Sequence, residues 1–150
     1  MLRTPVAVLL LVAGTAAADD AAAKKYLKDL EGTYTVVSMT QAGTVASADQ
    51  LKDVVAIVVK GDNLTIRFAK GDKGEDKAAI LVVDSTQTPV AIDMTPKDGP
   101  DAGKPVLGIV KVEKDTVTLC WGDRSDKAVR PKEFSSTKEN KHLLIVIKKK

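Results

Sequence analysis

The sequence predicts a mainly β domain, a small antiparallel β-barrel of about eight strands with a short helix before it. Two observations support this prediction. From Gly32 onward, about seven to nine short runs rich in apolar and β-branched residues alternate with turns of Gly, Pro, Asn and Asp. The final run, 143–147, is apolar on both faces and needs cover on both sides. A sandwich would also use short antiparallel strands, but closure of a barrel supplies that cover, so we favour the barrel.

The first 18 residues have the three parts of a secretory signal peptide. Arg3 supplies a positive charge, residues 5–13 are apolar, and residues 14–18 are small and end in an Ala-x-Ala cleavage site. The apolar stretch is shorter than the ~20 residues that span a bilayer; an uncleaved anchor is the alternative. The only cysteine, Cys120, is far from the cleavage point and cannot carry a lipid there. We therefore expect cleavage near Ala18 and a soluble exported protein, periplasmic or extracellular, with no stable membrane insertion.

Residues 19–29 are expected to form an N-terminal arm or short helix, and residues 30–150 to form the barrel domain. The arm is rich in Ala and Lys, which favour a helix. The run from Gly32 to Thr40 is dense in β-branched residues and predicts the first strand. Ser47 is a suitable N-cap for the helix formers that follow it, so a helix of one or two turns is expected over 47–52.

Two pairs of runs have the pattern of β-hairpins. Residues 54–60 and 64–68 are joined by a Gly-Asp-Asn turn, and Leu64, Ile66 and Phe68 alternate onto one face. Residues 106–113 and 116–121 flank a second short turn. Other strands are expected at 78–83, 91–95 and 143–148, with the longest loop at 96–105 and a short segment near 133–134.

Composition argues against several classes of function. Loss of residues 1–18 removes Arg3 and no acidic residue, so the net charge falls from +3 to +2 over the 132 residues left of 150. The basic cluster Lys148–Lys150 is short and the chain has only two Phe, two Tyr and one Trp, which argues against nucleic-acid binding. One cysteine cannot form an internal disulfide, and we expect packing to shelter Cys120; an intermolecular disulfide is the alternative.

No catalytic or metal-binding constellation is visible, so we predict a non-enzyme without cofactors. With one His and one Cys, the chain lacks the ligands of a zinc or copper site. Phosphate-binding glycine loops and the G-x-S-x-G motif are absent. His142 is expected to be exposed at a strand end, and Cys120 to be a packed thiol. The many carboxylates, such as those of Asp98 and Asp101, stand beside Gly, Pro or Lys as turn residues.

From residue 30 to 148, the order of short motifs resembles an uncharacterised lipocalin-like domain of exported planctomycete proteins. This resemblance implies a lipocalin-like β-barrel and secretion, and it brings no activity or catalytic residue. One departure is Tyr34, where the family often has Trp. By analogy with the Gly-x-Trp of lipocalins, Tyr34 would close one barrel end, with Arg130 as its stacking partner. The motifs are Leu30–Ser38, Leu64–Ile66, Ile92–Pro96, Asp98–Pro100, Leu107–Ile109, Asp115–Cys120, Arg130–Phe134 and Leu143–Ile147.

The leading functional hypothesis is an exported binding module that holds a small apolar or amphipathic ligand inside the barrel. Phe68 and Trp121 are the candidate ligand-binding residues. The hypothesis needs a cavity above ~300 Å³, the lower end for ligand pockets, and it fails if the interior is filled. The alternative is an envelope protein that binds another protein through an exposed apolar patch rimmed by the 96–105 loop.

Overall fold

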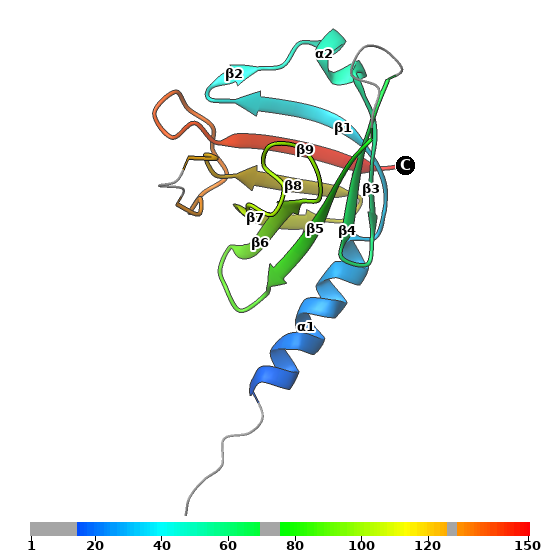
Figure 1. Ribbon diagram of the computed structural model, residues 1–150, viewed down its shortest axis with the longest axis vertical. Helices are drawn as coiled ribbons and strands as arrows, with labels where there is room; N and C mark the ends of the chain where they lie inside the picture. The colour runs from blue at the N-terminus through cyan, green and yellow to red at the C-terminus, as the bar shows by residue number, and fades with distance from the viewer. Residues whose placement is uncertain (1–14, 70–75, 126–128) are drawn as a thin grey trace, which may run out of the picture.

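The structure is a computed structural model that describes residues 15–69, 76–125 and 129–150. One antiparallel sheet runs in the order β2-β1-β3-β4-β5-β6-β7-β8-β9, and β1 also pairs with β9. Eight strands therefore form a closed barrel, with β2 as an extra strand beside β1 (Figure 1), and the predicted fold class is confirmed. The strands are β1 (Gly32–Gln41), β2 (Thr44–Val45), β3 (Val54–Lys60), β4 (Asn63–Phe68), β5 (Lys77–Asp84), β6 (Val90–Pro96), β7 (Val106–Glu113), β8 (Thr116–Trp121) and β9 (Leu143–Lys149).

Helix α1 (Thr15–Leu30) is longer than the predicted arm of residues 19–29. Its Ala-rich sequence favours the helical state throughout, and the helix includes the residues at the predicted cleavage point. Tyr26, Leu27 and Leu30 at its C-terminal end pack against the barrel core, and the rest of the helix projects away from one barrel end (Figure 1). Within the described residues, none of the helices has the length and apolar content needed to cross a bilayer. Residues 1–14 of the predicted signal peptide lie outside the described part.

The barrel wall separates between β1 and β3 at the end opposite α1. β1 pairs with β3 only over residues 32–34, whereas it follows β9 along its whole length from Tyr34 to Gln41, with a bulge between Val36 and Ser38. Helix α2 (Ala48–Lys52) contacts both diverging strands. Its N-cap Ser47 accepts a hydrogen bond from the Gln50 amide and the Gln50 side chain accepts one from the Ser47 amide, as in a capping box, which confirms the predicted helix.

Strand β2 was not expected from the sequence. A two-residue turn formed by Ala42 and Gly43, both with positive φ, reverses the chain after β1 and pairs Thr44 with Gln41. Such a turn suits Gly, whereas Ala at its first position gives a weak sequence signal. This short hairpin extends β1 beyond the barrel without adding a strand to its wall.

Alternation of side chains along the strands divides the buried residues into two sets. The central core contains the inward-facing residues of all eight barrel strands, among them Tyr34, Ile57, Ile92, Val110 and Ile147. Apart from Ala56 on β3, the buried apolar residues outside that core are Ala91, Ile109 and Cys120. These side chains face outward on β6, β7 and β8, where the segment after β8 covers them: Cys120 contacts Ser135, and Lys111 lies 5.1 Å from the centre of the Phe134 ring.

The segment between β8 and β9 determines which strands are buried on both faces. We expected β9 to be covered on both faces, but six of its seven residues are half-buried or exposed, including the outward-facing Leu144 and Val146, and Ile147 is its buried position. The strands with three consecutive buried residues are β7, over 108–110, and β8, over 119–121. The chain between β8 and β9 passes over those strands, so it shields their outer faces rather than that of β9.

Candidate ligand-binding site

The two ends of the barrel interior are packed differently. At the α1 end, the space between Leu30, Tyr34, Val59, Leu81 and their neighbours measures only about 10 Å³. At the opposite end, beyond Leu64 and Leu119, the interior contains a hollow of about 270 Å³, with a second hollow of about 300 Å³ next to it. The barrel is therefore filled at one end and hollow at the other, and the open end is the candidate site.

The first hollow has apolar walls and a polar rim. Trp121 forms part of its wall, and its ring lies across Gly108: a Cβ atom at Gly108 would be 2.5 Å from Cε3 of Trp121. Glycine at this position thus lets the only tryptophan lie flat against the β7 backbone. The apolar wall consists of Ile57, Leu64, Ile66, Met94, Val106, Leu119, Trp121, Leu143 and Ile145, and the polar or small residues are Gln41, Gly122, Asp123, Arg124 and Lys141.

The second hollow lies under the long loop between β6 and β7. Phe68 is in its wall, so the two predicted ligand-binding residues, Phe68 and Trp121, line neighbouring hollows. The loop adds the residues from Asp98 to Asp101. The hollows share Leu64, Ile66, Met94 and Arg124. Because these four residues line both, the hollows meet at the mouth of the barrel.

The rim of the mouth is built by two loops that come together there. The Arg124 guanidinium, after β8, lies 3.3 Å from a carboxylate oxygen of Asp101 in the β6–β7 loop. Both side chains are well exposed, 58% and 40%. Across the mouth, the side-chain amide of Gln41 donates a hydrogen bond to the Lys141 carbonyl oxygen over 3.3 Å, and this contact links the end of β1 to the start of β9. Of the residues that the structure describes, the charged ones that line the first hollow are Arg124, Lys141 and Asp123.

Tyr34 closes the opposite end of the barrel, but Arg130 is not its partner. The Tyr34 side chain is 1% exposed and its hydroxyl donates to the Leu30 carbonyl oxygen over 2.6 Å, which fastens α1 to the barrel. Burial raises the pKa of Tyr34 above its ordinary value. The cation over its ring is Lys149, at 5.7 Å, because β1 and β9 pair Tyr34 with Lys149. The stacking predicted from the lipocalin analogy is therefore corrected.

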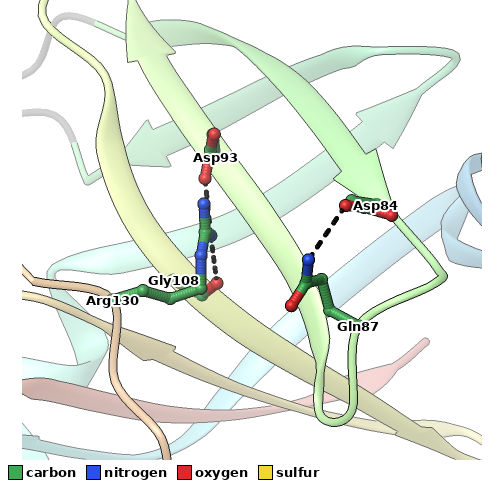
Figure 2. Close-up of polar contacts among 5 residues, drawn as sticks. All are labelled: Asp84, Gln87, Asp93, Gly108 and Arg130. Carbon is green, nitrogen blue, oxygen red and sulfur yellow. Dashed lines mark hydrogen bonds and ion pairs between the residues drawn. The ribbon is translucent and has the colours of Figure 1, made fainter.

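Arg130 instead holds the outer covering segment on the barrel. Its guanidinium donates to Asp93 Oδ1 over 2.7 Å and to the Gly108 carbonyl oxygen over 2.8 Å (Figure 2). Asp93 lies between the inward-facing Ile92 and Met94 and so points outward. The chain reaches this face because it crosses β6 and β7 after leaving β8. No local pattern could have revealed a contact between residues 37 positions apart.

Asp84, also in Figure 2, orders the turn between β5 and β6. Its carboxylate accepts hydrogen bonds from the Thr86 amide at 3.0 Å, from the Thr86 hydroxyl and, at 3.4 Å, from the Gln87 amide group. These hydrogen bonds, aided by the charge of Arg130, hold the pKa of Asp84 below its usual range. All of the partners belong to the turn, which indicates an Asx-type turn rather than a reactive carboxylate.

The thiol of Cys120 and the ring of His142 are brought near each other, with 3.9 Å between Sγ and Nδ1. His142 is half-buried, so the expectation of an exposed histidine is corrected. Cys120 has no exposed surface, its thiol donates to the Ser135 carbonyl oxygen over 3.4 Å, and burial raises the pKa of the thiol. A nucleophile needs the opposite, an accessible thiol with a lowered pKa. The contact is a packed thiol, as the sequence predicted for Cys120.

The surface offers less support for a protein-binding patch at the predicted place. Among the described residues, the large apolar side chains that are exposed are Val37, Val45, Val55, Val82 and Val129, and none of them belongs to the 96–105 loop. Clusters of three or more His, Cys, Asp or Glu side chains arranged for a metal ion were likewise not found in the described ranges. No family model matches the chain, and no similar curated protein or solved structure was found.

Proposed function

We propose that this protein is an exported, non-enzymatic binding module that holds a small apolar or amphipathic molecule in the open end of its barrel. The observation that carries the proposal is the contrast between the two ends of the barrel interior: about 10 Å³ of free space at the α1 end, and hollows of about 270 and 300 Å³ at the other. The larger hollow at the α1 end, about 710 Å³, is an open groove between α1 and β5 and does not enter the interior. A barrel that serves only to pack a core would have no reason to leave one end hollow.

The size and lining of the hollows support a small ligand. A volume of 270 Å³ corresponds to about nine water molecules at ~30 Å³ each, which is room for a chain of roughly ten heavy atoms. The second hollow stands at the lower limit of the range for ligand pockets, ~300–1,000 Å³, and the first is slightly below it. Their floor is apolar, so an apolar chain that displaces water from it would be stabilised by about 25 cal/mol for each Å² buried.

Export is part of the proposal and rests on the first 18 residues, with their positive charge, apolar stretch and small-residue cleavage site. The resemblance to lipocalin-like domains of exported planctomycete proteins supports the same compartment. The single, fully buried cysteine also suits an oxidising location, because a thiol without exposed surface resists disulfide exchange.

The proposal is tested with the uncharged fluorescent probe N-phenyl-1-naphthylamine and a pair of variants on β4. Ile66 lines both hollows, so Ile66→Trp fills them, and we expect it to abolish the rise in fluorescence that the wild-type protein gives. Thr65→Trp places the same side chain on the outer face of the same strand and is expected to leave probe binding unchanged. Equal probe binding by wild type and Ile66→Trp would contradict the proposal.

Native mass spectrometry of the protein purified from the exported fraction provides a second measurement. We expect a population with an added mass of a few hundred daltons at most, as the volume of the hollows allows, and its loss in Ile66→Trp. An exported protein that never carries an added mass and binds no probe would refute the proposal. A specific complex with another protein under those conditions would favour the alternative of an interaction domain.

A further inference from the structure

We infer that Arg124 binds the acidic headgroup of a ligand with a single negative charge, a monoanionic amphiphile whose apolar chain fills the first hollow. This inference rests on the proposed function and names the chemical class of its ligand. It begins from the position of Arg124. Of the four residues that line both hollows, three are apolar and Arg124 carries a charge, so its guanidinium stands where the apolar walls meet solvent.

The balance of charge in the first hollow favours an anion. In the described part of the chain, its lining includes two basic residues, Arg124 and Lys141, and one acidic residue, Asp123. Two cations against one carboxylate attract a single negative charge, whereas the nearby Asp123 disfavours a doubly charged group such as a phosphate monoester. The guanidinium also has the planar arrangement of donors that matches both oxygens of a carboxylate.

The present partner of Arg124 can be displaced. Asp101 lies 3.3 Å from the guanidinium, but the Arg124 side chain is 58% exposed, and exposed ion pairs contribute little to stability. Asp98 and Asp101 line only the second hollow. A ligand carboxylate that takes the place of Asp101 at Arg124 would therefore direct its chain away from these acids, toward Leu119 and Trp121 in the first hollow.

The test uses three ten-carbon amphiphiles that differ in the headgroup: decanoate, 1-decanol and decyltrimethylammonium. Each amphiphile is titrated at neutral pH against the wild-type protein with N-phenyl-1-naphthylamine bound, and the loss of probe fluorescence gives its Kd. We expect a Kd for decanoate about two- to fivefold lower than that for decanol, because the ion pair with the exposed Arg124 adds a small stabilisation, and the highest Kd for the cation. Binding of the uncharged probe tests the proposed function separately from the inference about the headgroup.

Two arginine variants locate the effect. Arg124→Met is expected to raise the Kd of decanoate about two- to fivefold and to leave those of decanol and the probe unchanged. Arg67→Met is the matched control, since Arg67 on β4 is also 58% exposed and also pairs with an aspartate, Asp76. It removes the same net charge and is expected to leave all Kd values unchanged. Asp101→Asn frees Arg124 and is expected to lower the Kd of decanoate.

Each outcome separates the two ideas. If the probe fails to bind, the proposed function fails and the inference falls with it. If the probe binds but the three amphiphiles displace it equally, or Arg124→Met and Arg67→Met weaken decanoate equally, the binding module stands and the headgroup assignment is wrong. If Arg124→Met raises the Kd of all three amphiphiles, Arg124 contributes to the wall of the hollow and does not bind the headgroup, and the assignment is refuted.

Discussion

Replacement of Tyr34 by Phe removes one hydroxyl group from the filled end of the barrel and leaves the ring in place. That hydroxyl donates to the Leu30 carbonyl oxygen over 2.6 Å, at a position where both residues are buried. Leu30 is the last residue of α1, and the final carbonyls of a helix have no partner within the helix. The variant therefore leaves a buried carbonyl group without its hydrogen bond.

The expected loss of stability follows from this geometry. An unsatisfied buried polar group costs about 1–3 kcal/mol, and we expect Tyr34→Phe to lower the free energy of unfolding by that amount. For a chain of about 150 residues, each kcal/mol lowers Tm by roughly 2–4 °C. The ring still fills the same space, so no cavity adds to the effect.

Urea unfolding followed by circular dichroism measures the change, with Tyr26→Phe as the control. Tyr26 is also partly buried against the core, but its hydroxyl has no hydrogen bond to the described residues. We expect the control to change the free energy of unfolding by less than about 0.5 kcal/mol. If the two variants lose the same stability, the hydrogen bond to Leu30 does not hold α1 on the barrel.

Alkaline pH provides a second test of the same residue. Burial raises the pKa of Tyr34 above its ordinary value of 10.0, so the folded state keeps the proton to a higher pH than the unfolded state does. The contribution of the protonated Tyr34 to the free energy of unfolding is complete below pH 10. It is lost as the pH rises from there through the pKa of Tyr34 in the folded state. The free energy of unfolding should therefore fall more steeply above pH 10 in the wild type than in Tyr34→Phe. Parallel curves would refute this reasoning.

Three further predictions concern other contacts. Gly108→Ala should lower the free energy of unfolding by about 1–3 kcal/mol, because the added Cβ would lie 2.5 Å from the Trp121 ring; thermal unfolding measures it. Arg130→Met should lower it by about 1–2 kcal/mol in urea, since it leaves the Asp93 carboxylate, 29% exposed, without its partner. The Cys120 thiol should react with a thiol reagent about a hundredfold more slowly in the native state than in urea, because it has no exposed surface.

Controls make these three outcomes decisive. The backbone at Gly108 has no positive φ, so the loss in Gly108→Ala reports the clash with the Trp121 ring; a Gly108→Ala protein as stable as wild type would show that Trp121 can move aside. Substitution of an exposed arginine such as Arg67 should change stability by less than about 0.5 kcal/mol. Fast labelling of native Cys120 would contradict its placement beneath the outer covering segment.

The local pattern of the sequence was enough to predict the eight barrel strands and the short helix α2, whereas closure was inferred from two-sided cover of β9, and the structure closes the barrel without that cover. Alternation at Leu64, Ile66 and Phe68, the Gly-Asp-Asn turn before them and the Ser47 cap each depend on residues a few positions apart, and each is present in the structure. Such signals act through backbone preference and the period of the strand, which no distant residue needs to complete. The short strand at Thr44–Val45 escaped prediction because its turn uses Ala42 at a positive φ.

Tertiary structure alone decided which side chains meet. Arg130 pairs with Asp93 on the outer face, Lys149 takes the place over Tyr34, and Arg124 stands where two hollows join. Each of these contacts depends on strand register and on the path of the chain after β8, which bring together residues far apart in the sequence. Local periodicity predicts the barrel but not that one end is filled and the other hollow. That difference depends on how side chains from all eight strands pack together, so it is set by the tertiary structure.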